Sequence, residues 1–335
     1  MRAAILKEPK GRLQIEERAM PTPGNGEVLI RVRACGVCHG DLMVRNGEFP
    51  FVRFPIVPGH EVTGVVENLG PGVDHPRRGT RVGVPWLFSA CGHCKQCILG
   101  DEVLCAGAQS TGMTRDGGYQ EFMLARADYV LPLPDALSFS DAAPLMCAGL
   151  SVYSGLHYAG FKPGDKVAVL GLGGLGEMAV QFARAMGGRV AVISSTKQKE
   201  VRARELGAEK FIHDGTEKID DALSSWDGGA DVILHVAPSP ASANAALRGL
   251  APDGTFVLLA PVPIAVDSLA LALRRQRIMG SSSGSRKELR ATLDLAAAHG
   301  IRSHCRRFPL DKVNDALAEL ETRRPAGRIV LTMDA

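Results

Sequence analysis

Hydrophobic and polar residues alternate over short stretches of the first 150 residues. In 27–33, branched aliphatic residues occupy every second position, which is typical of a strand that buries one face. The stretch 61–66 is short and rich in β-branched residues, and Pro-Gly and Gly-Pro pairs recur between such stretches. Residues 1–150 are therefore predicted to form a loop-rich β domain.

The pattern changes near Ser151, where short apolar stretches begin to alternate with alanine-rich stretches of helical periodicity. Alternating strands and helices indicate βαβ units around a parallel sheet. The predicted strands are 166–170, 189–193, 231–236 and 255–259, and the predicted helices are 177–186, 197–206 and 241–250. A helix at 286–299 leads out of this region, and the tail predicts a helix at 311–321 and a strand at 328–331.

Composition narrows the classes of protein that the chain can belong to. Its 335 residues suit two domains, and 45% hydrophobic with 22% charged residues fits a folded protein with a core. A net charge of +3 gives no sign of a nucleic-acid partner or an acidic membrane surface. No apolar run reaches the roughly 20 residues that span a bilayer, and charges follow the first residues too soon for a secretory signal. We expect a cytoplasmic protein without a membrane or nucleic-acid partner.

Four of the eight cysteines stand within fifteen residues, in the pattern Cys-x2-Cys-x2-Cys-x7-Cys. A long cytoplasmic chain favours metal binding or catalysis over disulfides. Four thiolates make a closed tetrahedral zinc site of the structural kind. Reduced core cysteines and an iron–sulfur cluster are the alternatives. The predicted ligands are Cys91, Cys94, Cys97 and Cys105.

A glycine-rich turn follows the predicted strand 166–170 and opens the next helix. A G-x-G-x-x-G pattern between a strand and a helix indicates a dinucleotide-binding site, although a plain βα turn is the alternative. Gly171 permits the tight turn, Gly173 lets the backbone approach a pyrophosphate, and Gly176 packs the helix on the strand. The helix N-terminus offers free N–H groups to the phosphates. The candidate cofactor-binding residues here are Gly171, Gly173, Gly174, Leu175 and Gly176.

The end of the second strand of such a unit selects the cofactor. NAD requires an acidic residue there, about 20 residues after the turn, to accept a hydrogen bond from the ribose 2′-hydroxyl. No acidic residue occurs before Glu200, and hydroxyls and lysines occupy the segment instead. The candidate residues are Ser194, Ser195, Thr196 and Lys199, which suit a 2′-phosphate, although a solvated helix start is equally compatible. The pattern favours NADP(H), with NAD(H) as the alternative.

Three separated segments contain further metal-binding residue types. Cys38, His60 and Cys147 could supply two thiolates and an imidazole, a set of three ligands that leaves a fourth zinc position open. Their spacing alone does not establish the site, because a single histidine or cysteine is more often structural.

Taken in order, these motifs resemble the zinc-containing alcohol dehydrogenases of the medium-chain dehydrogenase/reductase superfamily. The similarity covers nearly the whole chain, with features of the yeast and bacterial branch and of the cinnamyl alcohol dehydrogenase branch. The resemblance implies an α/β plus β fold. Residues 1–150 and 289–335 would form a GroES-like catalytic domain from both chain ends. Residues 151–288 would form a Rossmann domain, a doubly wound parallel sheet, between them.

The resemblance also implies roles for individual residues. Catalytic zinc would lie on Cys38, His60 and Cys147, giving two zinc ions per chain together with the four-cysteine site. Glu61 would stand beside the catalytic zinc as a transient ligand or a neighbour of the ligands. Asp41 would orient the zinc-binding histidine. The implied reaction is reversible hydride transfer between NADP(H) or NAD(H) and an alcohol/aldehyde pair, in a homodimer or homotetramer.

Further positions either match the family or depart from it. His39 and Arg328 match residues that contact the cofactor pyrophosphate. Gly40 replaces a serine or threonine whose hydroxyl begins a proton relay, and Met43 replaces a histidine at the end of that relay. These departures leave zinc binding intact but remove the usual route of the proton. A reductase of polarised C=C or C=N bonds, or a non-catalytic nucleotide-binding regulator, is therefore kept as an alternative.

Overall fold

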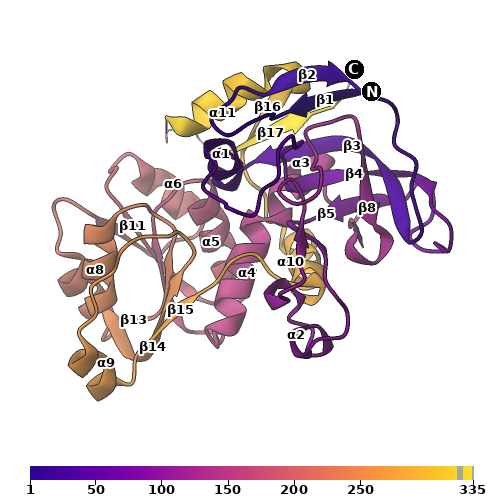
Figure 1. Ribbon diagram of the computed structural model, residues 1–335. Helices are drawn as coiled ribbons and strands as arrows, with labels where there is room; N and C mark the ends of the chain where they lie inside the picture. The colour runs from indigo at the N-terminus through magenta and orange to yellow at the C-terminus, as the bar shows by residue number, and fades with distance from the viewer. Residues whose placement is uncertain (323–326, 334–335) are drawn as a thin grey trace. The chain divides into compact units, whose positions relative to one another are not determined.

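The computed structural model describes residues 1–322 and 327–333 (Figure 1). The chain divides into two compact units, which we describe separately. The first comprises Met1–Leu150, Gly284–Ala298 and the described residues of Arg302–Ala335, so that both chain ends belong to it. The second comprises Ser151–Ser283 and His299–Ile301.

The first unit is built on a seven-stranded sheet in which a strand from the C-terminal part of the chain pairs with one from the N-terminal part. Six strands lie in the order β16-β17-β3-β4-β5-β9, and β8 pairs with β3. Their bounds are β3 (Glu27–Val37), β4 (Glu61–Leu69), β5 (Arg81–Val84), β8 (Phe122–Arg126), β9 (Leu131–Pro132), β16 (Cys305–Pro309) and β17 (Arg328–Thr332). The smaller sheets are β1 (Arg2–Ile5) with β2 (Gln14–Glu17) and β6 (Leu87–Ser89) with β7 (Gln109–Ser110).

Short helices connect these strands. The α-helices are α1 (His39–Asn46), α2 (Lys95–Ile98), α3 (Phe139–Ala142), α10 (Arg286–His299) and α11 (Val313–Glu321), and α4 (Ala148–Tyr158) begins in this unit. The 3₁₀ helices are η1 (Glu102–Leu104), η2 (Ala127–Tyr129), η3 (Ala143–Met146) and η4 (Leu310–Lys312). The core is aliphatic: Val28, Ile30 and Val32 of β3 are buried and pack with residues from both chain ends. The alternation in the sequence thus marks the strand at the centre of the sheet.

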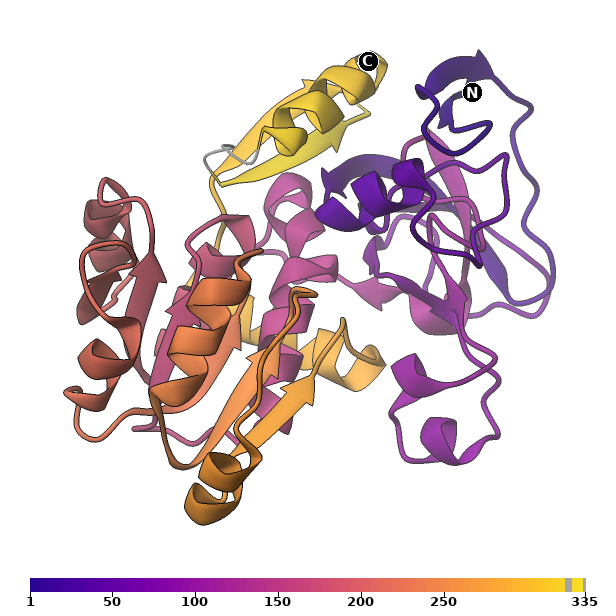
Figure 2. The ribbon, with the colours of Figure 1, turned by 60° about the vertical axis from the view of Figure 1, so that its left-hand side comes forward.

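The second unit is a six-stranded, wholly parallel sheet in the order β12-β11-β10-β13-β14-β15, with helices on both of its faces (Figure 2). Its strands are β10 (Lys166–Leu170), β11 (Arg189–Ser194), β12 (Lys210–His213), β13 (Ala230–His235), β14 (Leu250–Leu258) and β15 (Arg277–Gly280). Its helices are α5 (Gly174–Ala185), α6 (Lys199–Glu205), α7 (Ile219–Ser224), α8 (Pro240–Arg248) and α9 (Ser268–Arg274). This strand order is that of the Rossmann fold.

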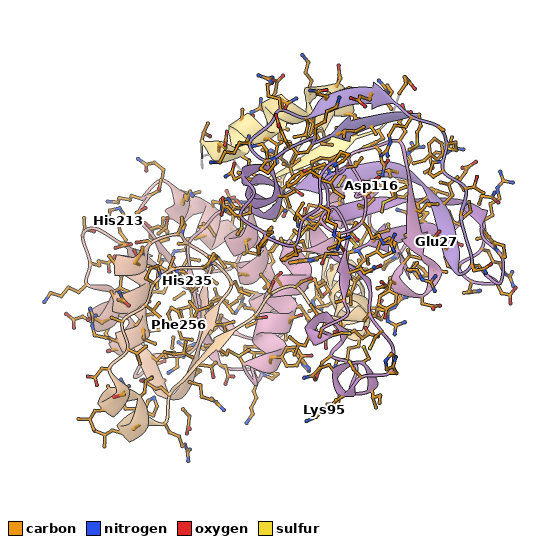
Figure 3. All side chains as sticks on the ribbon, viewed as in Figure 1. Glu27, Lys95, Asp116, His213, His235 and Phe256 are labelled. Atoms are coloured by element: carbon orange, nitrogen blue, oxygen red, sulfur yellow. The ribbon has the colours of Figure 1, made fainter. Side chains whose placement is uncertain are left out.

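The predicted elements between residues 166 and 259 are all present, and the predicted α/β plus β fold class is confirmed. The first helix was expected from residue 177 but begins at Gly174, inside the glycine-rich segment. The strands β12 and β15 were not predicted from the sequence, because each has only four residues. His235, fully buried on β13, stacks on Phe256 of β14 with ring centroids 5.8 Å apart (Figure 3). Among the described residues, no helix combines the length and the apolar character needed to cross a bilayer.

Candidate active site

Strand pairing in the first unit gathers the candidate catalytic residues. Gly36 of β3 pairs with Glu61, the first residue of β4, so Cys38 just after β3 lies beside His60 just before β4. Cys147 follows η3, which packs against β3, β4 and β5. The ligand atoms of Cys38, His60, Glu61 and Cys147 all lie within 4.8 Å of one another. The structure therefore brings together four side chains from three distant segments.

The geometry of this cluster suits a tetrahedral metal. Zn–S bonds of about 2.3 Å at tetrahedral angles place two sulfurs about 3.8 Å apart. The Sγ atoms of Cys38 and Cys147 are 4.0 Å apart. The hydrogen bond with Cys147, and the neighbouring His60, hold the pKa of the Cys38 thiol well below its usual range. The same hydrogen bond, together with burial, raises the pKa of Cys147 well above its usual range, so Cys38 is the first of the two thiols to become a thiolate.

Asp41 orients the histidine of the cluster. Cys38 is the N-cap of α1, and its backbone N–H donates to Asp41 Oδ2 at 2.9 Å, as part of a capping box. Asp41 Oδ1 lies 3.1 Å from Nδ1 of His60. Burial acts to lower the pKa of His60, but Asp41 and Cys38 outweigh it and hold that pKa well above its usual range. With Nδ1 committed to Asp41, Nε2 is the nitrogen left to bind a metal.

Glu61 and Arg328 form a buried ion pair beside the cluster. The β17–β3 register pairs Ile329 with Val37, so that Arg328 reaches the site from the far end of the chain. Its Nη2 donates to Glu61 Oε1, with the two side chains 9% and 0% exposed. Burial raises the pKa of Glu61 to about 7, although Arg328 opposes that shift. Within the part of the chain that the structure describes, Oε2 of Glu61 is buried without a hydrogen-bond partner.

The second cysteine cluster lies within one continuous segment, residues 91–105, which we call the four-cysteine lobe. Its four Sγ atoms lie within 4.8 Å of one another, with Cys91–Cys97 at 3.9 Å and Cys94–Cys97 at 3.6 Å. Backbone N–H groups donate to the sulfurs, from Cys94 to Cys91 at 3.4 Å and from Gly107 to Cys105 at 3.3 Å. Backbone donors from His93 and Cys94 lower the pKa of Cys91 to about 6. All eight cysteines, each a described residue, are free of disulfides.

The glycine-rich segment of the second unit has the geometry of a phosphate-binding turn. Gly171 has φ +108°, and a Cβ there would lie 2.9 Å from Cβ of Ala237. A Cβ on Gly176 would lie 2.0 Å from the carbonyl oxygen of Gly171, so only glycine allows this helix to pack so closely. Gly173 is the N-cap of α5, and a Cβ there would meet nothing within 4 Å. Open space therefore faces the first turn of α5.

The end of β11 lies next to this turn. Ser194 is its last residue, buried, with Oγ accepting a hydrogen bond from the Thr196 backbone N–H at 3.3 Å. Lys199 extends from the start of α6 to the turn, where its Nζ donates to the carbonyl of Leu172 at 2.7 Å. An ammonium group and the Ser194 hydroxyl thus lie at the edge of the candidate nucleotide site.

Known proteins share both units of this chain. Residues 24–135 match the family model for the alcohol dehydrogenase GroES-like domain, and residues 174–298 match that for zinc-binding dehydrogenases. An alcohol dehydrogenase of Geobacillus stearothermophilus is 41% identical over 340 aligned positions that cover 100% of both chains. The chain belongs to the zinc-type alcohol dehydrogenases of the medium-chain dehydrogenase/reductase superfamily. It is therefore an oxidoreductase of that type.

Two further similarities support the assignment of the chain to this family of dehydrogenases. The aldehyde reductase AdhA of Synechocystis is 36% identical, with 99% of this chain and 98% of the relative covered. The solved structure of a cinnamyl alcohol dehydrogenase from Sorghum bicolor has a TM-score of 0.90 and 33% identity, with 99% and 97% of the two chains covered. The family, and the two ligand clusters, support zinc and a nicotinamide nucleotide as its cofactors.

The sequence pattern did not single out Tyr119, which contacts Asp41 beside the cluster of this dehydrogenase. Tyr119 donates from its hydroxyl to Asp41 Oδ2 at 2.9 Å, and the ring of Trp86 lies 6.3 Å from that of His60. A Cβ on Gly40 would lie 3.1 Å from Cε1 of His60, so this glycine faces the ligand directly. No local motif marks Tyr119, because it belongs to a loop distant in sequence. His39, the first residue of α1, is exposed.

Proposed function

We propose that the chain is a zinc-dependent, NADP(H)-linked alcohol dehydrogenase or aldehyde reductase. The observation that carries the proposal is the convergence of Cys38, His60 and Cys147, with Asp41 on the far nitrogen of the histidine. In the oxidation, the C–H bond of the alcohol breaks with its electron pair passing to the nicotinamide, and the hydroxyl proton is lost. Aldehyde, NADPH and a proton are the products.

The residues of the cluster fit a catalytic zinc. Two sulfurs 4.0 Å apart and one imidazole would provide three ligands, and a carboxylate oxygen of Glu61 lies within 4.8 Å of those ligand atoms. When bound, zinc supplies Lewis acidity toward a carbonyl or hydroxyl oxygen, and the nicotinamide supplies or accepts the hydride. The protein's own residues hold this arrangement. Asp41 fixes the tautomer and orientation of His60, and Arg328 neutralises the buried carboxylate of Glu61.

Gly40 sets the route of the proton. A serine or threonine hydroxyl at this position would stand next to His60, whereas Gly40 offers neither donor nor acceptor on a side chain. Met43 on the same helix cannot accept a proton. The hydroxyl proton of an alcohol therefore leaves through water or through the cofactor's own ribose hydroxyls. We infer that oxidation is slow near neutral pH and that reduction of an aldehyde is the easier direction.

The second unit supports NADP(H) as the preferred nucleotide. The open space at Gly173 and the free N–H groups of α5 suit a pyrophosphate. At the end of β11, Ser194, Thr196 and Lys199 offer hydroxyls and a positive charge to a 2′-phosphate. The nearest downstream acid, Glu200, lies within α6. His39 and Arg328 remain proposed contacts of the cofactor, and NAD(H) is the alternative nucleotide.

The four-cysteine lobe would hold a second, structural zinc. Its sulfur–sulfur distances bracket the 3.8 Å or so expected for tetrahedral zinc–thiolate bonds. All four ligands come from the protein, so no position is left for a substrate. The N–H donors to Cys91 and Cys105 stabilise thiolates in this exposed lobe. Zinc here would contribute to folding and not to the chemistry.

A second copy of the chain is the proposed protein partner. The strand β15 is the edge of the six-stranded sheet, with one side unpaired among the described residues. The preceding helix α9 buries none of its residues, and Leu269 and Leu273 are 67% and 78% exposed. An exposed sheet edge with adjacent leucines suits pairing with an identical edge. Light scattering should give two or four times the monomer mass, and a monomer at micromolar concentration would overturn this assembly.

A substrate panel assayed with both cofactors tests the proposed activity. Primary alcohols and aldehydes are the expected substrates, as the names of the relatives suggest for those proteins. We expect NADPH-dependent aldehyde reduction that chelation abolishes and added zinc restores. Reduction of activated C=C or C=N bonds without any alcohol or aldehyde turnover would instead establish the alternative reductase. Nucleotide binding without turnover of any substrate would establish the regulatory alternative.

A further inference from the structure

Asp41 is fully occupied by hydrogen-bond donors, and one of them comes from outside the ligand segments. Its Oδ1 accepts from the Gly59 N–H at 3.2 Å and lies 3.1 Å from Nδ1 of His60. Its Oδ2 accepts from the Cys38 N–H at 2.9 Å and from the Tyr119 hydroxyl at 2.9 Å. A carboxylate has about four lone-pair sites, so all of them are engaged. Two of these donors are backbone N–H groups, and the two side chains that meet the carboxylate are those of His60 and Tyr119.

The loop that carries Tyr119 is tied to the segment before His60. Backbone bonds join Gly117 N–H to the Val57 carbonyl at 2.7 Å and Tyr119 N–H to the Pro58 carbonyl at 3.0 Å. The Tyr119 ring packs against Gly59, where a Cβ would lie only 2.5 Å from Cδ1 of the ring. Gly59 has φ +99°, a conformation that favours glycine. The backbone therefore holds the tyrosine in one place, with its ring wholly buried.

We propose that Tyr119 is a positioning residue of the catalytic zinc site, which acts on His60 through Asp41. This inference rests on the proposed function, since it assigns Tyr119 to the zinc that His60 would bind. Without the hydroxyl, Oδ2 of the buried carboxylate keeps a single donor, and an incompletely bonded buried charge is costly. Asp41 then has freedom to turn toward another donor, and His60 loses its fixed orientation.

The rate of zinc release to a chromogenic chelator tests the proposal on Tyr119→Phe, which keeps the ring and removes only the hydroxyl. Groups that hydrogen-bond a metal ligand directly are typically worth about 10- to 100-fold in metal affinity. Because Tyr119 acts one hydrogen bond further away, we expect catalytic zinc to leave about 10-fold faster, the low end of that range. The rate of zinc release from the four-cysteine site should not change. The Cys38→Ser variant shows which kinetic phase of zinc release belongs to which site. Tyr129→Phe is the matched control, because Tyr129 is a buried tyrosine of the same unit that lies beneath Arg286.

Each outcome is decisive. Unchanged release from Tyr119→Phe, or equal acceleration at both sites, overturns the role of Tyr119 while the proposed function stands. Wild-type protein that holds no zinc on Cys38, His60 and Cys147 overturns the proposed function and this assignment together. In an Asp41→Asn background, Tyr119→Phe should add nothing, because its effect passes through Asp41. An effect of the same size in that background overturns the proposed route.

Discussion

Replacing Gly40 with serine should restore a proton acceptor beside the catalytic cluster. A Cβ at this position lies 3.1 Å from Cε1 and 3.6 Å from Nε2 of His60, and 3.9 Å from Cε of Met113. The first distance is about 0.3 Å short of the 3.4 Å at which ordinary contact begins, so the imidazole must shift slightly. Gly40→Ala makes the same shift without a hydroxyl. The pair Gly40→Ser and Gly40→Ala therefore separates proton transfer from crowding.

The expected size of the effect follows from these distances and from general acid–base catalysis. A positioned proton-transfer group is typically worth about 10²–10⁴ in rate. Because His60 must yield to the new side chain and Met43 provides no onward acceptor, we expect the low end. Gly40→Ser should oxidise a small primary alcohol about 10²-fold faster than Gly40→Ala near pH 7. The difference should shrink toward alkaline pH, where hydroxide in the solvent accepts the proton.

The assay is a pH–rate profile of kcat and kcat/KM for alcohol oxidation, measured on the wild type and both variants with matched zinc content. The wild type should be slow at pH 7 and rise toward alkaline pH, whereas Gly40→Ser should show a flatter profile. The reasoning is refuted if Gly40→Ser and Gly40→Ala behave alike at every pH. It is also refuted if the wild type oxidises small alcohols as fast at pH 7 as at pH 10.

Three further substitutions have expected outcomes. Cys97→Ser should lower the melting temperature, measured by calorimetry, whereas Cys38→Ser should mainly abolish turnover in an activity assay. An unchanged melting temperature for Cys97→Ser would rule out a structural role for the four-cysteine site. Ser194→Asp should lower kcat/KM for NADP(H) relative to NAD(H), because it places a like charge beside the 2′-phosphate; a wild type that prefers NADH would contradict the choice of cofactor. Arg328→Met should destabilise the fold by about 3–5 kcal/mol in denaturant unfolding, because it leaves the buried Glu61 charge unpaired. The pKa of Glu61, already about 7, would rise further in this variant. The loss of stability should therefore be largest at alkaline pH and should shrink as the pH falls and Glu61 takes up a proton. Adding Glu61→Gln to Arg328→Met should recover much of the lost stability, and no recovery would contradict the role of the ion pair.

The sequence predicted the parallel sheet because β10, β11, β13 and β14 are apolar runs buried on both faces, and such runs stand out without any alignment. Helix starts were harder to predict. Glycine is a poor helix former, yet α5 begins at Gly174 and includes Gly176, because the close approach to the Gly171 carbonyl excludes any side chain. Tertiary packing here overrides helix propensity.

Although the spacing of Cys38, His60 and Cys147 alone does not establish a site, their role as ligands and that of the orienting carboxylate were predictable from the resemblance to a family. The partners around them were not. Tyr119 meets Asp41 across 78 positions, through backbone pairing of two irregular loops. Arg328 meets Glu61 across 267 positions, through the register of β17 on β3. Neither contact follows from local periodicity, so only the folded arrangement shows that Arg328 neutralises a buried carboxylate.

The zinc content of the wild type beside that of Cys38→Ser tests the central claim most directly. Elemental analysis of protein purified without chelators should give two zinc ions per chain for the wild type, one on each ligand cluster. Cys38→Ser should retain one zinc, keep its fold and lose hydride transfer. A wild type with a single zinc, or a Cys38→Ser variant that keeps both ions and its activity, would contradict a catalytic zinc on Cys38, His60 and Cys147.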